Sequence, residues 1–187
     1  MEKTKCPICK QEGEALLTSE QLEKEVLYVR NFYRERLRRY VADLTDQADF
    51  VQRDITGIDS CSDCSTIYRN PAPSPDEILD RYRTEEYDPE KLEFFFRIYT
   101  PHFLKRLRYI KKWLPENPKI LEVGAYAGGF MNACRTDGVK DVEGIDVCED
   151  INRFLRKKGF NIGNQSISEY ANDESADQLD CVAIWNC

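Results

Sequence analysis

The stretch Ile120–Phe130, which reads ILEVGAYAGGF, combines a buried-strand pattern with glycines at a turn. Its first apolar residues predict a short strand of a parallel sheet, and Gly124 marks a sharp turn or a close approach of the backbone to a ligand. Gly128 and Gly129 then lead into a segment that can form a helix. Because a helix amino terminus after a glycine turn presents free N–H groups, the stretch predicts a nucleotide-type site.

Residue types at this turn separate several kinds of nucleotide site. A P-loop ends in a lysine and a hydroxyl residue, but Phe130 and Met131 occupy those positions, so ATP hydrolysis is disfavoured. A dinucleotide fingerprint needs glycine where Tyr126 stands, so a dinucleotide is disfavoured as well. The remaining candidate is a ligand with a ribose but no phosphate. Glu122 would repel a pyrophosphate and suit an ammonium group, and S-adenosylmethionine fits that description.

A second acidic residue follows the next predicted strand. The segment DVEGIDV, residues 141–147, predicts a strand that ends at Asp146, about 20 residues after Gly124. A carboxylate at this distance is placed to accept hydrogen bonds from both ribose hydroxyls.

With these residues the sequence resembles the class I S-adenosylmethionine-dependent methyltransferases, whose first motif reads approximately L-E-x-G-x-G-x-G. The resemblance covers about residues 116–187. The matching residues are Glu122, Gly124, Gly128 and Asp146, whereas Tyr126 departs from the motif at its middle glycine. The resemblance implies S-adenosylmethionine as cofactor and an α/β fold with a Rossmann-like, doubly wound sheet.

The resemblance also implies roles for individual residues. Glu122 would orient the methionine end of the cofactor, Gly124 and Ala125 would allow it to approach the backbone, and Asp146 would bind the ribose. Transfer of the methyl group would be an in-line displacement by an O, N or C nucleophile of a small-molecule acceptor. Further cofactor contacts are expected at Ser166, Ile167 and Asn186.

The sequence assigns no catalytic acid or base. His102 is the only histidine, and it precedes the predicted sheet without a recognisable partner.

Two further strands are predicted, Phe160–Ile162 and Cys181–Trp185. The strand order 3-2-1-4 would bring the carboxyl ends of the first and fourth strands together at a binding crevice. The family's sheet continues beyond a fourth strand, so the chain is expected to end about halfway through the fold and to be an inactive fragment of its parent. The fourth strand would then be an exposed edge through which the chain self-associates.

Cysteine spacing predicts a metal site in the amino-terminal part. Cys6 and Cys9 form one C-x-x-C pair, and Cys61 and Cys64 form another. Each spacing lets a knuckle present two thiolates, so the two pairs together predict a four-sulfur Zn²⁺ site in a zinc-ribbon-like domain. The alternative is two unrelated pairs of buried or redox-active cysteines. The remaining cysteines lack pair spacing and are interpreted as small hydrophobic residues: Cys134, Cys148, Cys181 and Cys187.

Composition excludes several function classes. The net charge of −7 provides no electrostatic footprint for nucleic acid. No apolar run approaches the roughly 18 residues of a membrane span, and the charged start MEKTKCPICK is not a signal peptide. A cytoplasmic protein with reduced thiols is expected.

The segments between these motifs are predicted to be helical. A stripe with helical spacing predicts an amphipathic helix that covers the ribbon: Leu22, Val26, Val29, Tyr33, Leu37 and Val41. Ser74 and Glu77 form a capping-box pattern, and Pro101 is expected to bend or interrupt a helical region over residues 89–113. We therefore predict a zinc-binding domain over residues 1–73, a helical linker and cofactor cover over 74–115, and the first half of a methyltransferase domain over 116–187.

The layout as a whole resembles bacterial methyltransferases with an amino-terminal zinc-binding domain, some of which methylate nucleotide-linked or natural-product sugars. Two other functions stay open. One is a zinc-dependent interaction module with a non-catalytic Rossmann-like half. The other is a nicotinamide-dependent oxidoreductase, which Tyr126 and Glu122 oppose.

Overall fold

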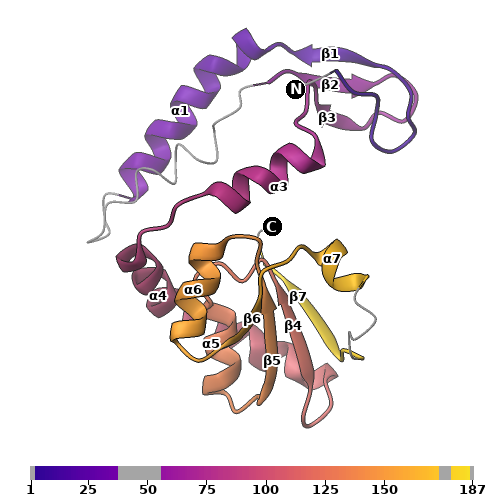
Figure 1. Ribbon diagram of the computed structural model, residues 1–187. Coiled ribbons are helices and arrows are strands. Elements are labelled where there is room, and N and C mark those ends of the chain that lie inside the picture. The colour runs from indigo at the N-terminus through magenta and orange to yellow at the C-terminus, as the bar shows by residue number, and fades with distance from the viewer. Residues whose placement is uncertain (1–2, 38–55, 173–177, 186–187) are drawn as a thin grey trace. The chain divides into compact units, whose positions relative to one another are not determined.

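A computed structural model describes residues 3–37, 56–172 and 178–185 (Figure 1). The chain divides into two compact units, Met1–Ile78 and Leu79–Cys187. In the first unit the structure describes β1 (Gly13–Leu17), α1 (Ser19–Leu37), β2 (Ile58–Cys61) and β3 (Ile67–Arg69). Helix α3 (Pro75–Thr84) crosses the boundary between the units. The second unit contains α4 (Pro89–Ile110), the 3-10 helix η1 (Lys111–Trp113), β4 (Lys119–Val123), α5 (Gly129–Thr136), β5 (Asp141–Ile145), α6 (Glu149–Lys157), β6 (Asn161–Gly163), α7 (Ile167–Ala171) and β7 (Cys181–Ile184).

The first unit is built on an antiparallel sheet of order β1-β2-β3. Gly13 of β1 lies opposite Cys61 at the end of β2, so the sheet brings the chain near Cys6 and Cys9 back beside the second cysteine pair. Side chains that the structure describes on α1 are mostly exposed, including those of Tyr28 and Phe32. Of the apolar stripe, Leu22 is partly buried, whereas the side chains of Val26, Val29, Tyr33 and Leu37, and the whole of Val41, lie outside the described part of the chain. The expectation that the helix covers the ribbon stays a prediction.

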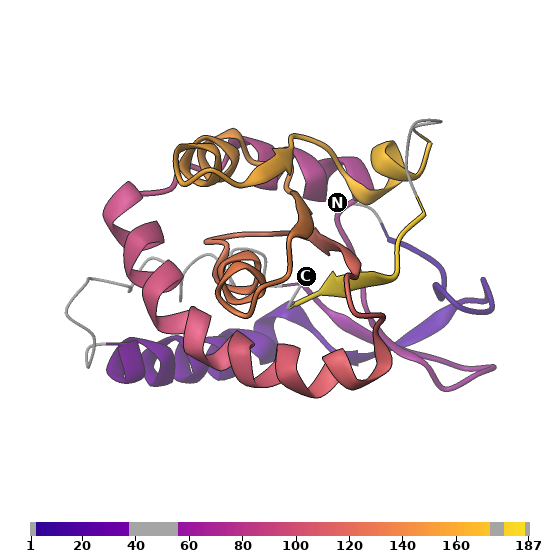
Figure 2. The same ribbon diagram turned by 90° about the horizontal axis from the view of Figure 1, so that it is seen from below.

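The second unit contains a parallel sheet of order β6-β5-β4-β7. This is the 3-2-1-4 order that the sequence predicts. Figure 2 shows α5 and α6 on one face of this sheet and α7 on the other, as in a doubly wound fold. The sheet is parallel and buried on the α5 face, which is why its strands appear in the sequence as short apolar runs.

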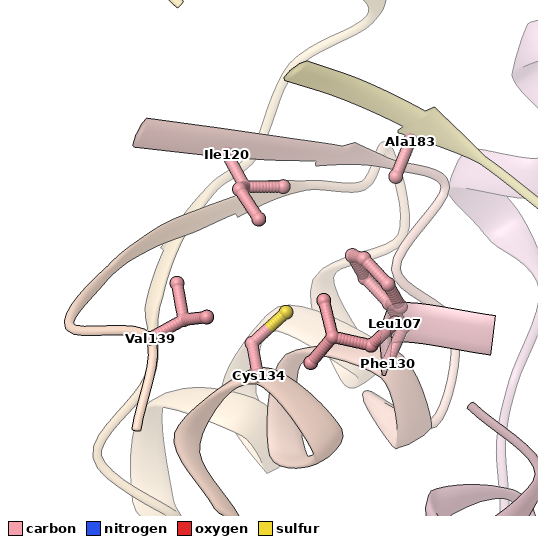
Figure 3. Close-up of a cluster of buried hydrophobic side chains, with 6 residues drawn as sticks. All are labelled: Leu107, Ile120, Phe130, Cys134, Val139 and Ala183. Carbon is pink, nitrogen blue, oxygen red and sulfur yellow. The ribbon is translucent and has the colours of Figure 1, made fainter. Parts of the chain in front are cut away.

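A cluster of buried side chains holds α4 and α5 against β4 and β7. Ile120 and Ala183 point from adjacent strands toward Phe130 and Leu107 on the helices, and Figure 3 shows these side chains meeting under the sheet. Each of these side chains is nearly inaccessible to solvent. Burial of an aliphatic or aromatic side chain contributes about 1.5–3 kcal/mol, so this contact fixes the sheet relative to the helices that cover it.

Helix α4 differs from its prediction at Pro101. The helix runs without interruption from Pro89 to Ile110, although proline removes one helical N–H group. Buried side chains lie on both sides of the proline, Phe96 before it and Leu107 after it. Their packing offsets the lost hydrogen bond, which the sequence pattern alone does not reveal.

The capping pattern before α3 forms as predicted. The Glu77 backbone N–H donates to the Ser74 hydroxyl oxygen at 3.1 Å, and the Ser74 backbone N–H donates to the Glu77 carboxylate at 2.7 Å. These hydrogen bonds satisfy backbone donors at the helix start.

No helix in the described ranges is long and apolar enough to span a bilayer.

Candidate functional site

The turn after β4 is tied to the end of the neighbouring strand β5. Gly124 has φ 68°, in the left-handed region that glycine adopts without a steric penalty. Its backbone N–H donates to the Ile145 carbonyl oxygen at 2.9 Å. The chain therefore turns sharply at the carboxyl edge of the sheet, as the sequence predicts for this glycine.

Position 128 favours glycine because of its backbone angle and because of the side chain packed against it. It precedes α5 as the N-cap residue with φ 71° and provides no side-chain cap. A Cβ atom at this position would collide with the side chain of Leu155 on α6. The glycine thus lets α5 and α6 pack closely at the edge where the strands end.

Tyr126 shows how a residue other than glycine fits the middle of the motif. Its φ is 46°, so it adopts the left-handed conformation itself. The strain is offset by contacts, since its N–H donates to Asp146 Oδ2 at 3.0 Å and its ring packs against two aromatic rings. The centroids of the Tyr87 and Phe95 rings each lie 5.7 Å from that of Tyr126.

Asp146 links the two loops at this edge. One carboxylate oxygen, Oδ2, accepts from the Tyr126 N–H after β4, and the other, Oδ1, accepts from the Cys148 N–H at 3.0 Å before α6. The residue is 9% exposed. Burial raises the pKa of Asp146 above its ordinary value, against the lowering effect of the hydrogen bonds from Cys148 and Tyr126.

Asn152 is a site-supporting residue that the sequence analysis missed. It is fully buried on α6, and its Nδ2 donates to the Asp146 backbone carbonyl at 2.9 Å. The hydrogen bond fixes the backbone from which the Asp146 carboxylate projects. A polar residue between the buried Ile151 and Leu155 was the available signal, because a buried amide needs a partner.

Glu122 lies beneath the turn rather than at its surface. It is 2% exposed, and its carboxyl group accepts a hydrogen bond from the Met131 backbone N–H in the first turn of α5. Among the described residues, its Oε2 atom has no hydrogen-bond partner. Burial raises the pKa of Glu122 well above its ordinary value, and the charge of Asp146 adds to the effect.

The segment expected to contact adenine lies just after β6. The Asp146 N–H donates to the Gly163 carbonyl at 3.1 Å, so β6 ends beside the acidic residue. The Ser166 hydroxyl accepts from the Glu169 N–H at 3.2 Å and caps α7, while Ile167 has an exposed side chain. Asn186 lies outside the described residues.

His102 is exposed on α4.

In the first unit, the cysteine pairs converge on one cluster. The ligand atoms of Cys6, Cys9, Cys61 and Cys64 all lie within 4.8 Å of one another. The Cys9 Sγ atom is 3.4 Å from the Sγ atoms of Cys61 and Cys64, and the Cys6 and Cys64 Sγ atoms are 3.6 Å apart. Sulfurs around a tetrahedral ion at about 2.3 Å would be about 3.8 Å apart. The cluster can therefore hold a metal ion.

The two knuckles have the same backbone form although neither contains the usual glycine. Lys10 and Ser65 each follow the second cysteine of a pair, with φ 65° and φ 59°. The Lys10 N–H donates to the Cys6 carbonyl and the Ser65 N–H donates to the Cys61 carbonyl, both at 3.0 Å. The matching turns aim both thiol pairs at one point.

No protein-family model and no curated protein match the chain. A solved structure described as a SAM-dependent methyltransferase from Archaeoglobus fulgidus is similar, with 26% sequence identity and a TM-score of 0.38. The match covers 44% of this chain and 37% of the methyltransferase structure.

We predict that Asp146→Ala destabilises the second unit by about 1.5–3 kcal/mol, because two backbone donors lose a charged acceptor. Both tryptophans, Trp113 and Trp185, belong to this unit, so urea unfolding followed by tryptophan fluorescence reports on it selectively. Asp141→Ala, an exposed position at the other end of β5, is the matched control and should leave the unfolding midpoint unchanged. Equal midpoints for Asp146→Ala and wild type would contradict the linking role.

Proposed function

We propose that the second unit is the cofactor-binding part of an S-adenosylmethionine-dependent methyltransferase. The observation that carries the proposal is the link from Asp146 to the turn after β4, which places a carboxylate beside backbone N–H groups at the carboxyl edge of a 3-2-1-4 sheet. Phe130 and Met131 are fully buried where a phosphate site would need a lysine and a hydroxyl residue. The site thus suits a ribose without a pyrophosphate.

The roles of individual residues follow from their positions. A carboxylate has about four acceptor sites, so Asp146 keeps capacity for ribose hydroxyls after accepting its backbone hydrogen bonds. Gly124 and Ala125 would face the methionine portion through their backbone, and Glu122 would receive its ammonium group. Ser166, Ile167 and Asn186 remain our proposal for the adenine end.

The bound cofactor would supply an activated methyl group on a sulfonium centre. The contribution of the chain is to orient that group and to exclude water from it. Aromatic side chains of α4 support such a role, because Phe95 stacks on Tyr99 with ring centroids 5.2 Å apart and also contacts Tyr126. Phe95 thereby packs an apolar ring against Tyr126, the residue whose N–H donates to Asp146.

We propose a small molecule as the methyl acceptor, a sugar or a natural-product intermediate. The net charge of −7 argues against nucleic acid. Isothermal titration with candidate acceptors in the presence of S-adenosylhomocysteine would identify the class.

We expect Gly124→Val to reduce S-adenosylmethionine affinity roughly tenfold or more, because a β-branched residue is strained at φ 68° and occupies space beside the turn. Isothermal titration calorimetry measures the effect, with Gly138→Val as the matched control. Gly138 also has a positive φ, 82°, but it lies at the opposite end of α5 with open space around it. Tight binding of NAD, or equal S-adenosylmethionine affinity in both variants, would argue for another ligand.

We also propose that the cysteine cluster holds one structural Zn²⁺ ion. Four thiolates in a closed set suit zinc, and the small sheet of the first unit has few buried apolar side chains to stabilise it otherwise. A cytoplasmic location, where thiols remain reduced, would be consistent with this.

Metal analysis after gel filtration should find one zinc ion per wild-type chain and a clear loss of zinc in Cys61→Ser, since three ligands bind the ion less tightly. Cys181→Ser is the matched control, because Cys181 lies on β7 outside the cluster. Full zinc content in Cys61→Ser would refute the site.

A second candidate function is a zinc-dependent interaction module. Exposed apolar side chains on the first unit favour it, with Ile8 71% and Ile67 63% exposed. Binding of a protein partner distinguishes the two functions. A module without catalysis would bind such a partner through these side chains, independently of S-adenosylmethionine.

We propose further that the chain self-associates through β7. Among the described strands, β7 pairs only with β4, and Val182 and Ile184 on its outer face are 48% and 54% exposed. Free backbone groups beside apolar side chains favour pairing with another strand.

Analytical ultracentrifugation should show concentration-dependent dimers that Val182→Lys weakens, whereas Val142→Lys on the covered strand β5 should disturb folding instead. Monomers throughout the concentration range would refute this pairing.

A further inference from the structure

Glu122 has a hydrogen-bonding arrangement that favours the neutral acid. Its carboxyl group accepts one backbone N–H, from Met131, and its Oε2 atom has no partner among the described residues. A buried carboxylate with one donor and no cation is strongly disfavoured, and such a group takes up a proton instead. Burial accordingly raises the pKa of Glu122 well above its ordinary value.

No positively charged group in the described part of the chain interacts with Glu122. On the adjacent strands, Gly144 of β5 and Ala183 of β7 lie opposite it. The titratable groups that interact with it in the described chain are Asp146 at the end of β5 and Cys134 on α5. Neither α4 nor β7 adds a charged group to this set. A cation brought by a ligand would therefore be the first positive charge that Glu122 meets.

We infer that Glu122 holds a proton in the ligand-free protein and releases it to the solvent when the ammonium group of a ligand binds beside it. This rests on the proposed function, and it makes Glu122 a specificity-determining residue. The exchange replaces a neutral acid by an ion pair, so the site gains no net charge from the combined steps. A ligand without an ammonium group cannot drive the release, and Glu122 would then remain protonated.

Proton release makes binding pH-dependent with a definite sign. Below the pKa of Glu122 in the free protein, the proton must be removed for the cation to bind, so affinity falls about tenfold for each unit of falling pH. Above that pKa the dependence disappears. The α-amino group of the ligand has an ordinary pKa of about 7.7–8.0, so measurements near pH 6.5 keep it protonated.

Calorimetry in buffers with different ionisation enthalpies counts the released protons. With S-adenosylmethionine and wild-type protein at about pH 6.5, the observed enthalpy in phosphate and in imidazole should differ by the amount for release of up to one proton. S-adenosylhomocysteine, which carries the same ammonium group, should give the same count. 5′-Methylthioadenosine lacks the amino-acid portion and should give none.

Two variants test whether the released proton comes from Glu122. Glu122→Gln keeps an oxygen that can accept from Met131, so we expect it to fold, to bind more weakly, and to release no proton at any pH. Glu143→Gln changes a half-buried glutamate on the neighbouring strand β5 and should keep the wild-type count. Proton release that persists in Glu122→Gln would assign it to another group and overturn the inference.

Failure of the proton exchange and failure of the proposed cofactor binding give different results. S-adenosylmethionine that binds wild-type protein with the same heat in both buffers would refute proton exchange and leave the cofactor assignment standing. Absence of binding in every buffer, with tryptophan fluorescence showing folded protein, would refute the proposed function and this inference together.

Discussion

A buried carboxylate that accepts backbone hydrogen bonds from two different loops holds the candidate site together. Asp146 receives the N–H groups of Tyr126 and Cys148, and Asn152 fixes its own backbone. In a poorly solvated position such charge-assisted hydrogen bonds are strong, and leaving their donors unpaired is costly. The ends of β4 and β5 and the start of α6 are thereby kept in a defined arrangement before any ligand binds.

This arrangement depends on chain conformations that few residues tolerate. Gly128 admits the side chain of Leu155, and Gly124 turns the chain at the end of β4. Tyr126 adopts a left-handed conformation without being glycine, because the hydrogen bond to Asp146 and its aromatic neighbours compensate the strain. Lys10 and Ser65 do the same in the cysteine knuckles, where local carbonyl acceptors provide the compensation.

Much of the fold of the second unit could be predicted from the sequence. Short apolar runs separated by helical patterns indicate parallel strands, and the acidic residue about 20 positions after Gly124 marks where the next strand ends. The two C-x-x-C knuckles were also predictable, because that spacing is a local property. The meeting of the two pairs depends in addition on the pairing of β1 with β2, which brings distant parts of the chain together.

The features that sequence reasoning missed depend on contacts between distant segments. The hydrogen bond from the Met131 N–H of α5 to Glu122 can be predicted only when the position of β4 beneath that helix is known. The hydrogen bond from Asn152 to the Asp146 carbonyl can be predicted only when the residues that face α6 are known. The uninterrupted helix at Pro101 depends on packing on both sides of it.

Hydrogen–deuterium exchange with and without S-adenosylhomocysteine tests the central claim, that the carboxyl edge of β4 and β5 is the cofactor site. Binding there should slow exchange in peptides that contain residues 124–131 and 146–150, while peptides from the β1–β3 sheet stay unchanged. Protection confined to other segments, or none at saturating ligand, would contradict the assignment.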